Sequence, residues 1–221
     1  MTYKVSPTSL GLMKDCPRCF WLEVVKGIRR PEHIFPTLPN GMDRIVKQHF
    51  DSFRLTSILP PELAKENIPE QLYPDIVLLE KWRDARQGLQ WQDERSGILL
   101  KGAVDDILMC QGKLIVLDFK TRGHPVREET PLYYQTQMDI YTFLLQKNGY
   151  PTQDYAYLLF YIPNQVHEGG KIHFDTHLVK LPVSVENAQH VFDKAVSIIN
   201  GQEPRPAPTC GYCNSKHAMI S

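Results

Sequence analysis

Residues 101–122 constrain the fold of this chain more than any other stretch. They read KGAVDDILMCQGKLIVLDFKTR, in which two runs rich in Val, Ile, Leu and Phe flank the dipeptide Gln111-Gly112. Apolar, β-branched runs on either side of a glycine-containing turn are typical of a β-hairpin. The stretch therefore predicts two antiparallel strands, over residues 103–110 and 113–121.

Two acidic side chains meet on one face of this hairpin. Partner numbers in a symmetric antiparallel hairpin add to a constant, so pairing Cys110 with Lys113 places Asp105 opposite Asp118. Directly opposed side chains have β-carbons about 5 Å apart, and like charges at that separation repel. A cation between the two carboxylates would turn this repulsion into a binding site. Because side chains alternate along a strand, Lys120 shares the face of Asp118.

These residues, in this order, resemble the PD-(D/E)XK nuclease superfamily. The sequences GAVD at 102–105 and DFK at 118–120 are similar to the G-x-x-D and D-x-K strands of its RecB-like branch. QMDIY at 137–141 matches the Q-x-x-x-Y helix signature of the same branch. The resemblance implies an α/β fold with a restriction-endonuclease-like core, in which helices flank a mixed sheet.

The resemblance also implies a metal site for phosphodiester hydrolysis. Asp105 and Asp118 would bind Mg²⁺ or Mn²⁺, which take hard oxygen ligands, and the carbonyl of Phe119 would be a third ligand. Lys120 would orient or deprotonate the attacking water and offset negative charge. A surface carboxylate pair with a lysine salt bridge is the alternative interpretation of these side chains.

A strong helix is expected over residues 131–146. Tyr134, Gln137, Met138 and Tyr141 share one of its faces at i, i+3, i+4 and i+7. A core stripe with one polar member would give the same pattern. Since the helix directly follows the D-x-K strand, the resemblance implies instead that Gln137 and Tyr141 border the metal site and contact the DNA backbone.

An amphipathic helix over residues 43–53 departs from the family pattern. RecB-like enzymes carry a histidine metal ligand at G-x-x-x-H spacing, and that position is occupied here by Ile45. His49 lies one turn later and is the expected replacement ligand. Alternatively Asp43 or Lys47 faces the site, and His49 is an exposed helix side chain.

The cysteines point to a second metal site. Cys16 and Cys19 form one C-x-x-C pair, Cys210 and Cys213 form another, and Cys110 lies alone at the hairpin turn. In a cytosolic protein such pairs indicate a metal rather than disulfides. Four thiolates suit either Zn²⁺ or an iron–sulfur cluster, and spacing does not separate the two.

Resemblance to the CRISPR-associated and AddB-type exonucleases implies a [4Fe–4S] cluster. Those enzymes supply one N-terminal and three C-terminal cysteines, whereas this chain offers two and two, so Zn²⁺ stays as the alternative. His217 is a candidate substitute ligand or a tail residue. Residues 1–30 and 202–221 would form a cysteine-bound metal lobe of a single domain, 1–221. Because such a centre closes nearly the whole chain, the metal-free form should fold poorly.

Charge and hydropathy limit the function. Lys and Arg number 25, as do Asp and Glu, so no net charge attracts nucleic acid and any binding must use local patches. Lys26, Arg29 and Arg30 form one such patch, or a solvated loop. No run approaches the roughly 18 apolar residues of a membrane span, and the N-terminus lacks a signal peptide's apolar core. A cytoplasmic location is therefore expected.

Together these features predict a Mg²⁺- or Mn²⁺-dependent deoxyribonuclease. Its expected substrate is DNA that is single-stranded or has free ends, cut exonucleolytically in repair or defence, with protein partners in a repair or CRISPR complex. The main alternative is an inactive DNA-binding module or a subunit of a larger helicase–nuclease complex, which the missing histidine favours. A third is a zinc-stapled interaction domain, which salt-dependent DNA affinity would separate from the others.

Overall fold

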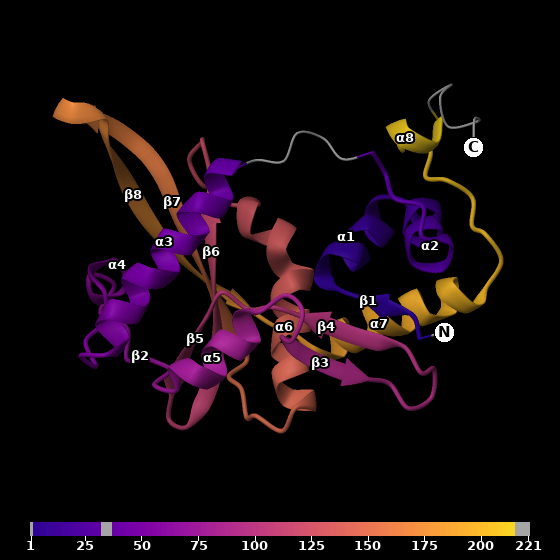
Figure 1. Ribbon diagram of the computed structural model, residues 1–221, viewed down its shortest axis with the longest axis horizontal. Helices are drawn as coiled ribbons and strands as arrows, with labels where there is room; N and C mark the ends of the chain where they lie inside the picture. The colour runs from indigo at the N-terminus through magenta and orange to yellow at the C-terminus, as the bar shows by residue number, and fades with distance from the viewer. Residues whose placement is uncertain (1, 32–36, 215–221) are drawn as a thin grey trace.

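The computed structural model describes residues 2–31 and 37–214. Its strands form two sheets, and helices cover them (Figure 1). His217 lies outside the described residues. The larger, mixed sheet has the order β2 (Gln71–Leu72), β5 (Asp106–Cys110), β6 (Lys113–Thr121), β7 (Tyr155–His167) and β8 (Lys171–Pro182); the smaller has the order β1 (Lys4–Val5), β4 (Leu99–Gly102) and β3 (Leu89–Gln92).

The helices begin and end at common boundary residues. Prolines stand in the first turns of several, where a missing N–H costs no hydrogen bond, and Gly27 ends one in a left-handed conformation. The helices of the described residues are α1 (Pro7–Asp15), α2 (Pro17–Lys26), α3 (Thr37–Arg54), α4 (Pro61–Ala64), α5 (Ile76–Arg83), the 3₁₀ helix η1 (Thr130–Tyr134), α6 (Gln135–Lys147), the 3₁₀ helix η2 (Glu168–Gly170), α7 (Val185–Asn200) and α8 (Gly211–Asn214). None of the helices within the described residues is long and apolar enough to cross a membrane.

The predicted hairpin register is confirmed. Cys110 pairs with Lys113, and the ladder continues to Asp106 opposite Leu117. Gln111 and Gly112 take positive φ angles of 52° and 74°, as a two-residue turn with the twist of its strands requires.

The predicted start of the first strand is wrong. β5 begins at Asp106, because Gly102 ends β4 in the smaller sheet and residues 103–105 pass from one sheet to the other. Asp105 therefore lies in a crossing segment, one residue before the ladder. The apolar character of the stretch does not distinguish a strand from a buried crossing.

β6 is buried on both faces, and this alternation positions the functional side chains. Leu114 and Val116 pack in the core with α6 and α7, whereas Ile115 and Leu117 pack in a second core with α3 and α4. Figure 1 shows α3 and α6 on either side of β6. By the same alternation, Asp118 lies on the α6 side.

β6 and β7 are parallel and joined through η1 and α6, as parallel neighbours require a crossover. β7 and β8 form a long antiparallel ribbon that extends beyond the rest of the sheet (Figure 1). At the other side of the molecule the two ends of the chain meet, where α1 and α2 pack against α7 and α8 lies above α2. The fold is thus a mixed α/β fold of the restriction-endonuclease-like kind.

Candidate active site and cysteine centre

The D-x-K strand and the Q-x-x-x-Y helix meet in one hydrogen-bonded group. Gln137 Nε2 donates to Asp118 Oδ1 at 3.1 Å and to Tyr141 Oη at 3.0 Å. Lys120 Nζ donates to Gln137 Oε1 at 3.2 Å and lies 2.5 Å from Asp118 Oδ2. Four of the predicted site residues are therefore in mutual contact.

The packing of α6 explains why they meet. Met138, on the predicted helix face, is fully buried, and Asp118 is only 1% exposed. Tyr134, which ends η1, places its ring 4.6 Å from Lys120 Nζ in a cation–π contact. The predicted helix stripe thus contains both core residues and the polar residues that contact β6.

Asp105 reaches the same region from the crossing segment. Its Oδ2 accepts a hydrogen bond of 3.0 Å from the backbone N–H of Phe119. Its Oδ1 lies 2.9 Å from Nζ of Lys47, which also lies 2.8 Å from Oδ2 of Asp43. Of the α3 side chains considered from the sequence, Lys47 is the one that contacts Asp105, and Asp43 contacts Lys47.

The side chains of two predicted metal ligands, Phe119 and His49, contact residues outside the acidic site. The ring of Phe119 packs on Phe50, 4.7 Å between centroids, and the role of its carbonyl stays a prediction. His49 Nε2 lies 3.1 Å from Glu62 Oε1, at the start of α4, and its side chain is 41% exposed. The structure pairs His49 with this carboxylate.

Electrostatics fit the repulsion expected between the two aspartates. Burial and then the charge of Asp105 raise the pKa of Asp118 to about 7, while Lys120 and Lys47 oppose the shift. Burial would lower the pKa of Lys120, but attraction to Asp118 raises it. Burial also raises the pKa of Tyr141.

The oxygen atoms at this site suit a divalent cation. Among the described residues, the buried Oδ2 of Asp118 has no partner in hydrogen-bonding geometry, although Lys120 Nζ is close. A buried carboxylate beside a second carboxylate is an arrangement that Mg²⁺ or Mn²⁺ would stabilise. The donor set of Asp105 and Asp118 therefore fits the ion that the sequence predicted.

Sequence reasoning missed the role of Gly102. A β-carbon there would lie 2.8 Å from Cε1 of Tyr141 and 3.0 Å from Cδ1 of Leu144. The glycine of the first motif is therefore the surface on which the tyrosine of the third motif packs. The G-x-x-D motif carried this signal, because a glycine at a motif position indicates that another group approaches the backbone closely there.

A buried ionic network, also missed, holds the crossing segment. Asp106 is fully buried, with Oδ1 2.6 Å from Arg54 Nη2 and Oδ2 3.1 Å from Arg83 Nη2. Arg83 also donates to the backbone carbonyl of Asp105 at 2.8 Å and to Asp51 Oδ2 at 2.7 Å. The second aspartate of the Asp105-Asp106 doublet thus anchors the backbone that presents the first.

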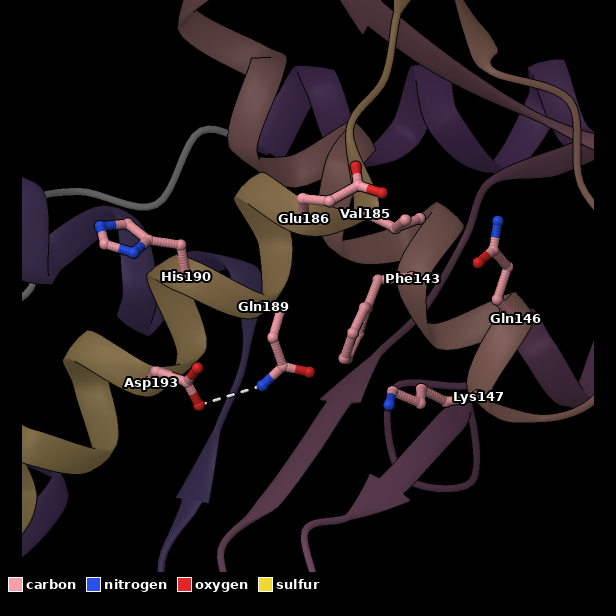
Figure 2. A pocket seen from close by; sticks show the side chains of 8 residues that line it. All are labelled: Phe143, Gln146, Lys147, Val185, Glu186, Gln189, His190 and Asp193. Carbon is pink, nitrogen blue, oxygen red and sulfur yellow. Dashed lines mark hydrogen bonds between the residues drawn. The ribbon is translucent and has the colours of Figure 1, made fainter.

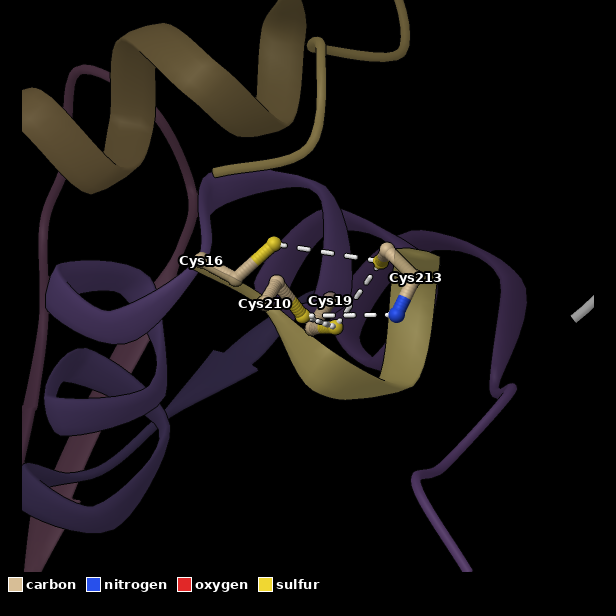
Figure 3. Close-up of side chains that lie close together, drawn as sticks. All are labelled: Cys16, Cys19, Cys210 and Cys213. Atoms are coloured by element: carbon tan, nitrogen blue, oxygen red, sulfur yellow. Dashed lines mark hydrogen bonds between the residues drawn. The ribbon is translucent and has the colours of Figure 1, made fainter. Parts of the chain in front are cut away.

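The four paired cysteines converge as predicted. Their sulfur atoms all lie within 4.8 Å of one another (Figure 3). Sγ of Cys19 lies 3.3 Å from that of Cys213 and 3.7 Å from that of Cys210, and the sulfurs of Cys16 and Cys213 are 3.9 Å apart. This group joins the start of α2 to α8 and could hold a metal ion.

The surroundings of the cysteines favour a thiolate at Cys16, whereas burial raises the pKa of Cys19 and of Cys213. Although burial opposes the charge, backbone N–H groups of Ala207 and Cys19 help to lower the pKa of Cys16 to about 6. Arg30 Nη2 lies 3.6 Å from Sγ of Cys210. Arg30, expected in a basic patch or a solvated loop, therefore contacts the cysteine centre.

An open cavity of about 600 Å³ lies between α6 and α7, away from both centres (Figure 2). Gln189 donates to Asp193 at 3.0 Å, and the side chains of Lys147, Glu186 and His190 also line it. The cavity is open and is lined by side chains of both charges, so we assign it no catalytic role.

Comparison with known proteins agrees with this geometry. The family model for the PD-(D/E)XK nuclease superfamily matches residues 4–218, which include both aspartates, Lys120 and all four paired cysteines. No curated protein matches the sequence. The chain therefore belongs to the PD-(D/E)XK nuclease superfamily.

Proposed function

We propose that this chain is a metal-dependent deoxyribonuclease of the RecB-like branch, acting as an exonuclease on single-stranded ends in repair or defence. Membership of the superfamily implies a nuclease that uses divalent metals on a nucleic acid. The observation that carries the proposal is the hydrogen-bonded group of Asp118, Lys120 and Gln137 beside Asp105. A surface salt bridge would not account for the nearly complete burial of Asp118.

Asp105 and Asp118, with the carbonyl of Phe119, are the proposed metal ligands. When bound, the ion would lower the pKa of a water molecule and polarise the phosphate. We leave His49 out of this ligand set, because its imidazole contacts Glu62. Asp43 stays a candidate through its contact with Lys47, which contacts Asp105.

Lys120 would orient the attacking water as an ammonium, because, although burial opposes the charge, attraction to Asp118 raises the pKa of Lys120 and keeps it protonated. Its ammonium is held by Asp118, Gln137 and the ring of Tyr134, so a water next to Asp118 would meet it in a fixed position. Gln137 fixes both partners at once, since its amide bonds Asp118 through Nε2 and Lys120 through Oε1. Tyr141 supports Gln137 from the next turn of α6.

We further propose that the cysteine centre is a structural metal site within a single domain, residues 1–221, and that residues 1–30 and 202–221 form its lobe. A tetrahedral Zn²⁺ with bonds of about 2.3 Å holds its sulfurs roughly 3.8 Å apart. Three of the six sulfur separations, of 3.3, 3.7 and 3.9 Å, are close to that value, and the others are no more than 4.8 Å. In a [4Fe–4S] cluster each thiolate binds a different iron, which sets the sulfurs further apart. The spacing favours zinc, and metal analysis with visible absorption spectroscopy would distinguish the two.

A cleavage assay tests the nuclease. End-labelled single- and double-stranded DNA is incubated with anaerobically purified protein and Mn²⁺ or Mg²⁺, with EDTA as the metal-free control. Lys120→Ala should reduce cleavage by about 10²–10⁴-fold. Lys113→Ala, an exposed lysine on the same strand, should cut at the wild-type rate. Cleavage by Lys120→Ala at the wild-type rate would overturn the assignment.

The alternative is an inactive DNA-binding module or a subunit of a larger nuclease assembly. The observation that favours it is the contact between Lys47 and Asp105, because the Lys47 ammonium lies next to a carboxylate that is proposed to bind metal. RecB-like enzymes would supply a histidine ligand from this helix instead. Metal-dependent DNA binding without cleavage of any strand would support this alternative.

A further inference from the structure

Two faces of α3 contact different parts of the molecule. Ile45 and His49, one turn apart, lie with Glu62 in a shallow groove beside α4. Asp43 and Lys47, also one turn apart, contact each other, and Lys47 contacts Asp105. The residue that α3 contributes to the acidic site is therefore a lysine.

Lys47 occupies one of the two oxygens of Asp105. Its Nζ lies 2.9 Å from Oδ1, while Oδ2 accepts the backbone N–H of Phe119. A divalent cation that binds Oδ1 must compete with this ammonium, because two positive charges at such a distance repel. Metal binding and the Lys47 contact are therefore in opposition.

The Lys47 side chain can move away from Asp105 and stay near the site. This side chain is 19% exposed, so part of it is accessible to solvent. Lysine is a compact charge on a flexible stem that binds phosphate as a point charge. Asp43, four residues earlier on α3, lies 2.8 Å from Nζ and would keep the ammonium near the site after Asp105 releases it.

Binding of a divalent cation also changes the sign of the net charge of the site. Asp43, Asp105 and Asp118 formally carry three negative charges, against two positive charges on Lys47 and Lys120. A divalent cation makes the group positive overall. The site then attracts a phosphodiester that it would otherwise repel.

We propose that Lys47 is an exchangeable cation of the active site. It neutralises Asp105 in the metal-free protein, yields Oδ1 to the divalent ion, and then binds a non-bridging phosphate oxygen of the nucleic acid strand. The phosphate contact rests on the proposed nuclease function, whereas the exchange at Asp105 rests only on the metal binding proposed there. Lys47 thus couples metal binding to substrate binding.

A Mn²⁺ titration of the full chain, followed by calorimetry or by the electron paramagnetic resonance of free Mn²⁺, tests the exchange. Lys47→Met should bind Mn²⁺ about tenfold more tightly than the wild type, because it removes the competing charge. Arg44→Met removes an exposed charge from the same helix and should stay within about twofold. Unchanged or weaker Mn²⁺ binding by Lys47→Met would overturn the exchange.

Fluorescence anisotropy with labelled single-stranded DNA tests the phosphate contact. Lys120→Ala is the parent in this test, so that the strand stays intact. In saturating Mn²⁺, adding Lys47→Met should weaken binding and reduce the slope of log affinity against log salt by about 0.7. In EDTA the same change should leave the slope unaltered, since Lys47 is then held by Asp105. Lys47→Arg keeps the charge and should restore the slope in Mn²⁺.

Equal slopes in Mn²⁺ with and without Lys47, or an equal loss in Mn²⁺ and in EDTA, would overturn the phosphate contact. Failure of the proposed function gives a different result. If the wild-type protein neither binds nor cuts DNA in Mn²⁺, the nuclease proposal and the phosphate contact fall together, whereas the Mn²⁺ titration still decides whether Lys47 exchanges with metal.

Discussion

The acidic site and the cysteine centre both gather charged or ionisable side chains, but the chain builds them in opposite ways. Asp118 and Lys120 lie on β6, which is buried on both faces and paired with strands on either side. The cysteines join α2 to α8, a helix of only four residues, with few apolar neighbours around them. The sheet holds the acidic site in place. In the cysteine lobe α1 and α2 pack into the main core, and the sulfurs join α2 to α8.

This difference separates what each site does for the molecule. The acidic site places like charges in a buried position, which costs stability and leaves a place for a cation. The cysteine centre ties residues nearly 200 positions apart, which a metal bound there would convert into folding free energy. We therefore expect the acidic site to be dispensable for folding, and the cysteine centre to be required.

Breaking the cysteine centre should have the largest effect. Replacing Cys210 and Cys213 together by serine removes two thiolates, and we expect a loss of about 5 kcal/mol or more. A loss of this size lowers the melting temperature by roughly 10–20 °C for a chain of this length. Thermal unfolding followed by circular dichroism measures it. Cys110→Ser, outside the centre, is the matched control and should shift the temperature far less.

Chelation makes the same comparison without mutation. Protein stripped of metal should melt at the temperature of the double variant. A stripped sample that melts with the untreated protein would show that the lobe folds without its metal, and the contrast between the two sites would disappear.

Much of this contrast could be predicted from local sequence. The hairpin register followed from the position of Gln111-Gly112, because one turn determines every pair along two strands. The contact of Gln137 with Asp118 agrees with the resemblance, which implied that Gln137 and Tyr141 border the metal site. The grouping of the cysteines followed from two short motifs with one plausible use.

The rest depended on distant parts of the chain. Nothing local distinguishes Asp105 from Asp106, and they separate only because Arg54 and Arg83 arrive from two other helices to enclose the second. The choice of Lys47 over His49 depended on the rotation of α3 against the sheet, which period alone does not determine. Both are matters of packing between elements far apart in sequence.

Breaking the anchor under the acidic site should have the next largest effect. Asp106→Ala removes the buried carboxylate that both Arg54 and Arg83 contact and leaves Asp51 as their acidic partner, and loss of one partner in a buried pair costs about 3–5 kcal/mol. Denaturation by urea measures this loss. Asp105→Asn, the neighbouring residue, should cost far less. Equal losses for the two aspartates would contradict the separate roles given to them.

The pH dependence of stability sharpens the comparison further. The pKa of Asp118 is raised to about 7, so the folded chain holds a proton that the unfolded chain releases near pH 4. Stability due to this group is therefore present below about pH 4 and lost as pH rises through about 7, by an amount on the order of 4 kcal/mol.

Asp118→Asn removes this dependence and keeps the shape of the side chain. Urea denaturation in EDTA at pH 5 and pH 8 would compare the two proteins, with the groups facing Asp118 unchanged, namely Asp105, Lys120, Lys47, Gln137 and Tyr141. The fall between the two pH values should be larger in the wild type. A wild type that falls no further than the variant would contradict the cost assigned to the buried carboxylate.

The smallest predicted effect tests whether the acidic site is held by packing alone. Gly102→Ala would place a methyl group 2.8 Å from the ring of Tyr141, and such overpacking costs about 1–2 kcal/mol. The ring must shift, and the shift would pull on Gln137, so cleavage should fall by about tenfold while Mn²⁺ binding changes little. Gly11→Ala, in α1 with open space around it, is the control and should not destabilise.

A double variant decides whether the tyrosine is the cause. If the methyl group acts through the ring, Gly102→Ala should cost less in a Tyr141→Leu background than in the wild type, and the two changes should couple by about 0.5–1 kcal/mol. Additive losses would mean that Leu144 or the backbone takes the strain instead. Coupling would show that the first and third motifs form one packed unit, because the glycine of one is shaped to receive the tyrosine of the other. The acidic site would then owe its geometry to apolar contact, and the cysteine centre would owe its geometry to metal.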